Sequence, residues 1–334
     1  MAAIINAAYN AYRHIFYDLR DTRSDDWFLM NSVWAPLSII AFYLYFVLSV
    51  GPRLMKNRPP MKLDTVIKIY NITQVILCIY ITERSLTLGW ARKYRWFCEP
   101  VDYSNTLDAY LVMKAVYSYL LVKLFDLLDT VFFVLRKKDK QVSFLHVYHH
   151  AGIFFGTWII MKFLPVAADL EILGKLQVGR RILAGGALAR FSQSLCTMVP
   201  QILTPQHKMQ RMGPALQHYN RYHDEGHDML ARIVTGGHGT FLGTINSIVH
   251  VVMYTYYFVT NTWPEHKNNI WWKKYVTQLQ MAQFLLVALH AAPVLFIKNC
   301  NYPRTIAGLM AFQYSFMFLL FWDFYKKAYR KKTE

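Results

Sequence analysis

The sequence has little charge and few cysteines for its length. Charged residues make up 17% of its 334 residues, whereas the hydrophobic class makes up 54%, a balance more apolar than that of an ordinary soluble domain. None of the four cysteines forms a CxxC pair, so neither a zinc knuckle nor a disulfide-rich scaffold is indicated. Residues 1–30 contain several acidic side chains and lack the basic start and unbroken apolar stretch of a cleavable signal peptide.

Long apolar windows favour a membrane protein. Each approaches the roughly 20 residues that a helix needs to cross about 30 Å of hydrocarbon. They cover roughly 34–52, 64–88, 108–135, 145–164, 238–260, 276–298 and 304–325. We therefore expect an all-α polytopic membrane protein with about seven transmembrane helices, the first of which inserts the chain.

The net charge of +17 gathers in the connections between these windows. Seven alternating spans put four basic clusters on one side, and the positive-inside rule makes that side cytoplasmic. The clusters are Arg53, Lys56, Arg58 and Lys62; Arg136, Lys137, Lys138 and Lys140; Lys267, Lys273 and Lys274; and Lys326, Lys327, Arg330, Lys331 and Lys332. The amino terminus is then luminal and the carboxyl terminus cytoplasmic, although the loop with Arg92, Lys93 and Arg95 falls in the lumen. Membrane orientation explains the charge, so nucleic-acid binding is not expected.

The same topology places Cys98 and Cys300 together in the luminal compartment. An oxidising environment there allows a disulfide between the two loops that carry them. Spacing alone leaves two free thiols equally open.

Residues 166–235 interrupt the pattern of spans. Charges, Gly and Pro are scattered through them, and no clean span of the necessary length fits. We interpret the chain as one membrane domain in two parts, 1–165 with spans one to four and 236–334 with spans five to seven and the tail. Between them lies an atypical insertion, 166–235, which we expect to form a luminal loop.

Ionisable residues inside membrane spans are costly and usually mark function. Lys123, Asp126 and Asp129 lie at i, i+3 and i+6 in the third window, on one broad helical face. They are either part of a site or a buried ion-pair set that only positions helices.

The fourth window opens with "HVYHH", which puts three histidines at i, i+3 and i+4 on one face near the cytoplasmic end. A lone histidine is usually structural, but three together on an apolar helix indicate a catalytic or metal role. The histidines are His146, His149 and His150.

Two further windows carry polar and aromatic stripes at helical spacing. Four consecutive spans therefore offer polar faces, which is how a helical bundle builds a site, and a long apolar cavity beside them suits an acyl chain. The stripes are Asn246, His250, Met253, Tyr254 and Tyr257 in the fifth window, and Thr277, Gln280 and Gln283 in the sixth.

These four sets of residues resemble the sequence boxes of the ELO family of fatty-acid elongases, the membrane 3-ketoacyl-CoA synthases. The likeness covers roughly residues 27–165 and 236–332 and keeps the order of the boxes. They are "KLFDLLDT" at 123–130 for KxxExxDT, "HVYHH" at 146–150 for HxxHH, "NSIVHVVMYTYY" at 246–257 for NxxxHxxMYxYY, and "TQLQMAQ" at 277–283 for TxxQxxQ.

The resemblance implies condensation of a long-chain acyl-CoA with malonyl-CoA, which yields a 3-ketoacyl-CoA two carbons longer, CoA and CO2. It further implies six helices in a bundle around a narrow acyl cavity, in the endoplasmic-reticulum membrane, with no metal or other cofactor. Contacts with other enzymes of the elongation cycle and a homo-oligomer are implied in the same way. Lys331 and Lys332, followed by two last residues, resemble a dilysine retrieval signal.

A neutral imidazole can attack a thioester, and no serine or cysteine nucleophile competes with the histidines. We therefore expect His149 to take the acyl group as an acyl-imidazole, with His250 facing it as an acid–base or second nucleophilic partner. In the expected scheme His146 and His150 orient these rings or assist decarboxylation. Asp126 and Asp129 fix the tautomers, and Lys123 neutralises the two carboxylates. The residues expected to bind substrate are Asn246, Met253, Tyr254, Tyr257, Thr277, Gln280 and Gln283.

The chain departs from the family pattern at two places. Asp126 stands where the pattern most often has Glu, a change that shifts its hydrogen bond by about one methylene. Removing the insertion would join "KFLP" directly to "GGHGTFLGTINS", which resembles the continuous sequence of family members. The insertion is a luminal elaboration, or retained or mispredicted coding sequence.

Two other functions fit parts of the sequence. A di-iron desaturase or hydroxylase also uses clustered histidines, and His218, His223 and His227 have the spacing of ligands on one helical face. Only one complete HxxHH is present, however, and those three histidines fall in the insertion, where a polar loop is the simpler interpretation. A seven-span receptor or transporter fits the topology but leaves the polar boxes without a task.

Overall fold

The computed structural model describes residues 2–13, 16, 24–101, 106–183, 237–263, 265 and 270–329. No β-strand occurs in these ranges, so the protein belongs to the all-α class that the sequence predicts. The helices are α1 Ala2–Arg13, α2 Trp34–Tyr45, η3 Phe46–Val50, α3 Gly51–Met55, α4 Asp64–Ser85, η4 Leu86–Trp90, α5 Leu107–Phe125, α6 Leu127–Leu135, η5 Asp139–Gln141, α7 Phe144–Leu183, α10 Thr240–Thr262, α11 Ile270–Ala291, η8 Ala292–Leu295 and α12 Arg304–Tyr329.

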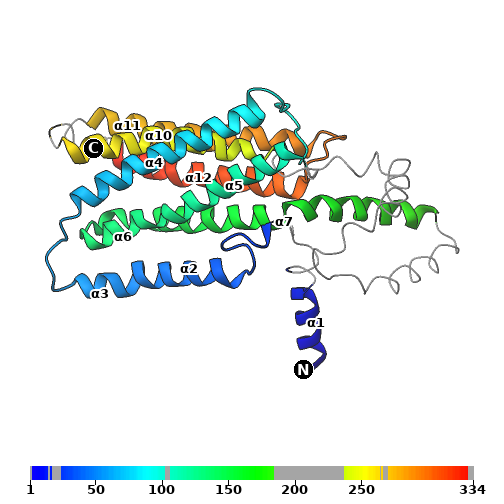
Figure 1. Ribbon diagram of the computed structural model, residues 1–334, viewed down its shortest axis with the longest axis horizontal. Helices are drawn as coiled ribbons and strands as arrows, with labels where there is room; N and C mark the ends of the chain where they lie inside the picture. The colour runs from blue at the N-terminus through cyan, green and yellow to red at the C-terminus, as the bar shows by residue number, and fades with distance from the viewer. Residues whose placement is uncertain are drawn as a thin grey trace, which may run out of the picture.

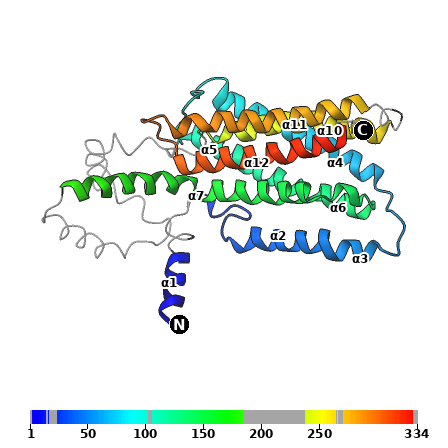
Figure 2. The same cartoon turned by 180° about the vertical axis from the view of Figure 1, so that it is seen from behind.

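The long helices lie roughly parallel and antiparallel to one another (Figures 1 and 2). α4 packs against α10 and α11 against α12. In Figure 1, α3, α6, α10 and α12 all end at the left and α11 begins there, and we call this the basic end. The described basic residues of the four clusters lie on or beside these helix termini, which puts them on one side as expected. The opposite end is the disulfide end.

Four helical segments are long and apolar enough to cross a membrane, so the chain is a multi-pass membrane protein. They are Trp34–Met55, Asp64–Trp90, Trp272–Leu295 and Arg304–Tyr329, found within the ranges described above. The helices with the polar boxes of the third, fourth and fifth windows are not among them. Charged and polar side chains lower the hydropathy of those helices, and such residues survive in a membrane where they face protein rather than lipid. The expected total of about seven spans stays a prediction.

The fourth predicted window ends too early. α7 continues from Phe144 to Leu183, so the first part of the predicted luminal loop, 166–235, is helical. The reason is propensity, because "VAADLEILGKLQ" is rich in strong helix formers. In Figure 1 this part of α7 extends beyond the ends of the neighbouring helices. The rest of the insertion, with the three histidines at 218, 223 and 227, and the dilysine at 331 and 332 lie outside the described residues.

A cross-linked loop anchors the start of α10 at the disulfide end. Of the two states that the sequence leaves open, the structure has the Cys98–Cys300 disulfide, with Cα atoms 5.7 Å apart. The His238 N–H donates to the Glu99 carbonyl at 2.9 Å, and burial lowers the pKa of the His238 ring. Gly237 has a positive φ of 54°, and a Cβ there would lie 2.5 Å from the Pro100 carbonyl oxygen, so only glycine fits. The cross-link therefore helps to set the position of α10 and of the site residues on it.

Candidate active site

A buried ion pair lies where α5 gives way to α6. Lys123 stands in the last turn of α5, and Asp126 occupies the single position between the two helices. The Lys123 Nζ donates to Asp126 Oδ2 at 2.8 Å, and the side chains are 0% and 1% exposed. Charges this deeply buried persist only when they are paired and hydrogen-bonded. The sequence placed both on one face of the third window, and the structure brings them into contact.

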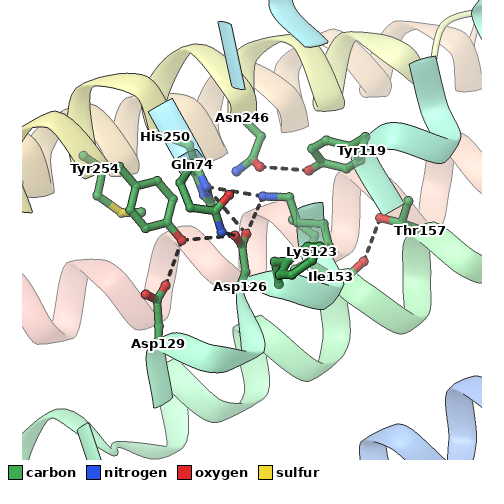
Figure 3. A network of polar contacts seen from close by, with 12 residues as sticks. Gln74, Tyr119, Lys123, Asp126, Asp129, Ile153, Thr157, Asn246, His250 and Tyr254 are labelled. Atoms are coloured by element: carbon green, nitrogen blue, oxygen red, sulfur yellow. Dashed lines mark hydrogen bonds and ion pairs between the residues drawn. The ribbon is translucent and has the colours of Figure 1, made fainter. Parts of the chain in front are cut away.

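Neighbouring helices supply the other partners of Asp126. Its Oδ1 accepts a hydrogen bond from Gln74 Nε2 on α4 at 2.8 Å and one from the Tyr254 hydroxyl on α10 at 3.1 Å. The same hydroxyl lies 2.8 Å from Asp129 Oδ2, so it joins the two carboxylates (Figure 3). Tyr70 also contacts this group, since Gln74 Nε2 donates to its hydroxyl at 3.0 Å. The carboxylate is thus held from three helices.

His250 completes the centre from α10. Its Nδ1 lies 3.3 Å from Lys123 Nζ and 3.6 Å from Asp126 Oδ2, and only 5% of the residue is exposed. One turn earlier, Asn246 Oδ1 accepts a hydrogen bond from the Tyr119 hydroxyl at 2.9 Å, and Asn246 Nδ2 donates to Gln283 Oε1 at 3.5 Å. These contacts link α5, α10 and α11 around His250 (Figure 3).

The histidine cluster forms the first turns of α7. Ser143 Oγ accepts a hydrogen bond from the His146 backbone N–H at 3.2 Å, which is a typical helix N-cap. The His146 and His150 rings are 4.2 Å apart between centroids, and the His149 ring lies 5.6 Å from His150 and 5.9 Å from Phe284 of α11. Both His146 Nε2 and His150 Nδ1 are buried and make no hydrogen bond to any residue that the structure describes. They are buried polar atoms whose hydrogen-bonding capacity is unused among the described residues.

The cluster and the centre are close enough to act on each other through charge. His149 lies within electrostatic range of Lys123, and His250 lies within range of His149. Within the described ranges, no group of three or more His, Cys, Asp or Glu residues is arranged so that it could hold a metal ion.

The remaining residues of the stripes are more scattered. Gln280 Nε2 donates to Met253 Sδ at 3.3 Å, so this pair lies between α10 and α11. Thr277 Oγ1 donates to the Lys273 carbonyl at 3.0 Å, and the hydroxyl is not hydrogen-bonded to the buried ion pair. Tyr257 is 36% exposed, and its ring lies 6.0 Å from the ring of Tyr254 between centroids. The structure therefore brings Asn246, Tyr254 and Gln283 into the network but leaves Thr277 and Tyr257 nearer the basic end.

An apolar cavity adjoins the polar centre on its disulfide-end side. It is open on one side, comprises about 850 Å³ of space free of protein atoms together with the open space at its mouth, and lies among α4, η4, α5, α7 and α10. Its walls include Val112, Val116, Met161 and Leu242. Tyr119 lines the cavity and also hydrogen-bonds to Asn246. The cavity and the polar network therefore share a wall residue.

Sequence reasoning missed three members of this network: Gln74, Tyr70 and Tyr119. The first two lie at i+4 and i inside the second window, with buried Asn71 beside them. That polar group within an otherwise apolar span was a usable signal. Tyr119 carried no such signal, because a single tyrosine in a membrane helix is unremarkable by spacing alone.

Together, the apolar helices, the buried polar centre and the adjoining cavity define an integral-membrane protein with an apolar cavity beside a buried polar centre. The chain belongs to the GNS1/SUR4 (ELO) family, and the model of that family matches residues 28–172 and 229–334. It is 32% identical to very long chain fatty acid elongase 1 of Mus musculus over 332 residues, 99% of this chain and 92% of that protein. It is 31% identical to very long chain fatty acid elongase 7 of Drosophila melanogaster over 324 residues, 97% and 77% of the two chains.

Proposed function

We propose that the protein elongates long-chain fatty acids by condensing an acyl-CoA with malonyl-CoA to give a 3-ketoacyl-CoA, CoA and CO2. Family membership and the names of the relatives support the reaction class. The observation that carries the proposal is the shared wall at Tyr119, because it sets an apolar cavity suited to an acyl tail beside the buried ion pair: Tyr119 lines the cavity, and Lys123 Nζ lies 4.9 Å from the centroid of its ring.

In this proposal His149 attacks the thioester carbonyl and holds the acyl group as an acyl-imidazole. Lys123 of the polar centre lies within electrostatic range of its ring. The tail extends into the apolar cavity, where burial of each CH2 contributes about 0.8 kcal/mol. The two CoA thioesters are the only small molecules the reaction needs, and the basic end attracts their phosphates.

Orientation follows from the two ends of the molecule. A cytoplasmic basic end agrees with the positive-inside rule, and the disulfide end then faces an oxidising lumen, as a stable disulfide requires. We therefore propose an endoplasmic-reticulum membrane protein with a luminal amino terminus and a cytoplasmic carboxyl terminus.

The purified protein tests the function directly. With labelled malonyl-CoA and a series of acyl-CoA lengths, we expect 3-ketoacyl products two carbons longer than the substrate. With acyl-CoA alone, mass spectrometry should find one acyl group on the peptide with His149. His149→Ala should abolish the adduct, whereas His238→Phe, which keeps an aromatic ring at the opposite end of the bundle, should retain it. A full adduct in His149→Ala would remove His149 as the nucleophile.

A further inference from the structure

One contact sets the state of the His250 ring. Its Nδ1 is 3.3 Å from Lys123 Nζ, within hydrogen-bond reach, but 3.6 Å from Asp126 Oδ2, which is too long for a hydrogen bond. Figure 3 shows this nitrogen turned toward the ion pair. The partner of Nδ1 is therefore the lysine.

The lysine decides where the proton of the ring lies. An ammonium group has three protons and no lone pair. One proton goes to Asp126 Oδ2 at 2.8 Å, and another points at His250 Nδ1. An imidazole nitrogen in that position must offer its lone pair, since a proton on it would oppose the protons of the lysine. The neutral ring consequently carries its proton on Nε2.

The ion pair cannot easily turn to reverse this arrangement. The other oxygen of Asp126 already accepts from Gln74 at 2.8 Å and from Tyr254 at 3.1 Å. Rotation of the carboxylate toward His250 would break these buried hydrogen bonds, each of which costs about 1–3 kcal/mol to leave unmade. Gln74 comes from α4, outside the four polar boxes, and is 1% exposed.

We propose that His250 is a fixed hydrogen-bond donor through Nε2–H that stabilises the oxygen that becomes negative during the reaction, and that Gln74 is the positioning residue that holds the ion pair for it. This inference rests on the proposed elongase function. It replaces the expected acid–base or nucleophilic role of His250, because a ring whose free nitrogen carries a proton has no lone pair there to offer.

The acyl transfer makes one bond and breaks one. A ring nitrogen of His149 forms a bond to the thioester carbon, and the carbonyl π pair moves onto oxygen, which accepts the hydrogen bond from His250. The pair then re-forms the carbonyl, the C–S bond breaks, and CoA leaves as a thiolate whose charge balances the acyl-imidazolium. His250 keeps its proton throughout, as an oxyanion-stabilising group does.

Replacement of His250 separates the two roles. Glutamine offers an amide N–H near the position of Nε2 but can carry neither an acyl group nor a transferred proton. We expect His250→Ala to lower kcat about 100- to 1,000-fold and His250→Gln to lower it about 10-fold or less. Equal losses in the two variants, with both still folded, would overturn the donor role.

The tautomer itself is measurable without any turnover. In protein labelled with 15N-histidine and held in lipid nanodiscs, the His250 signals are assigned by their loss in His250→Gln. We expect a protonated Nε2 and a bare Nδ1, a mixture of tautomers in Lys123→Met, and an unchanged signal in the control Lys114→Met, an exposed lysine on the same helix. Gln74→Met should also mix the tautomers and lower kcat with little change in KM.

These readouts distinguish two failures. A protonated Nδ1 in the wild-type protein would overturn the inference whatever the protein catalyses. The expected tautomer together with no elongation from any acyl-CoA would instead contradict the proposed function.

Discussion

At the scale of single residues, the Tyr254 hydroxyl bridges the two buried carboxylates of the centre. It lies 3.1 Å from Asp126 Oδ1 and 2.8 Å from Asp129 Oδ2, and the residue is 0% exposed. Tyr254→Phe removes the donor and leaves two buried carboxylates short of a partner. We expect a loss of about 1–3 kcal/mol of stability and a lower elongation rate, measured by thermal unfolding in detergent and by product formation.

The matched control is Tyr314→Phe. Tyr314 is also buried in the bundle, but its hydroxyl makes no hydrogen bond to a described residue. Its removal should cost less than about 1 kcal/mol, since no buried partner loses a hydrogen bond. Similar destabilisation by the two changes would show that ring packing, rather than the bridge between carboxylates, carries the effect.

Residue chemistry was predictable where costly side chains stood out against apolar surroundings. Lys123, Asp126 and His250 each violate the composition of a membrane span, so the sequence alone marks them. Their pairing depends on how α5 and α10 pack and was not readable from spacing within one helix. Gln74 was missed for the same reason, because its partner lies on another helix, 52 positions away.

At the scale of elements, two glycines on different helices make a matched test of the cavity. Gly243 of α10 lines it, and a Cβ there would lie 3.9 Å from the Tyr119 ring, so a small side chain fits but a large one fills the cavity. We expect Gly243→Leu to shorten the longest acyl-CoA that is elongated by two or more carbons. Product lengths measured by mass spectrometry check this.

Gly156 of α7 is the control for that change. It is also helical, but a Cβ there would meet nothing within 4 Å, and the residue does not line the cavity. Gly156→Leu raises the helix propensity by the same amount as Gly243→Leu, about 1 kcal/mol relative to glycine. It should leave the product lengths unchanged. Shortened products from both variants would argue for a general disturbance of the bundle.

Helix boundaries followed the apolar windows wherever turn residues bracketed them, as at 64–88 against α4 and its η4 extension, Asp64–Trp90. The third window, in contrast, is divided at Asp126 into α5 and α6, and the fourth ends before α7 does. There the scattered Gly and Pro of 166–235 were interpreted as breakers, whereas a run of good helix formers continues the helix to Leu183. Local propensity outweighed the overall irregularity of the segment, which composition over 70 residues cannot resolve.

At the scale of the whole molecule, the two ends differ in chemistry. Helix termini with basic residues gather at one end, and the disulfide closes the other (Figure 1). The sequence predicted this difference between the ends, because alternating spans place the basic loops on one side of the membrane and both cysteines on the other. The polar centre and the cavity lie between the two ends, so a change at the disulfide end should affect the rigidity of the bundle more than the chemistry.

Removal of the disulfide tests this separation. Cys98 and Cys300 are 202 positions apart, and cross-links over long loops typically contribute about 2–4 kcal/mol. We expect the double variant Cys98→Ser/Cys300→Ser to unfold at a lower temperature yet still form the acyl adduct, because none of the contacts of His250 and Lys123 involves the cross-linked loops. Reductant should lower the unfolding temperature of the wild-type protein to that of the variant and leave the variant unchanged. Unfolding temperatures that respond neither to the substitution nor to reductant would mean that the packing of the loop, with Gly237 against Pro100, already holds this end without the covalent bond.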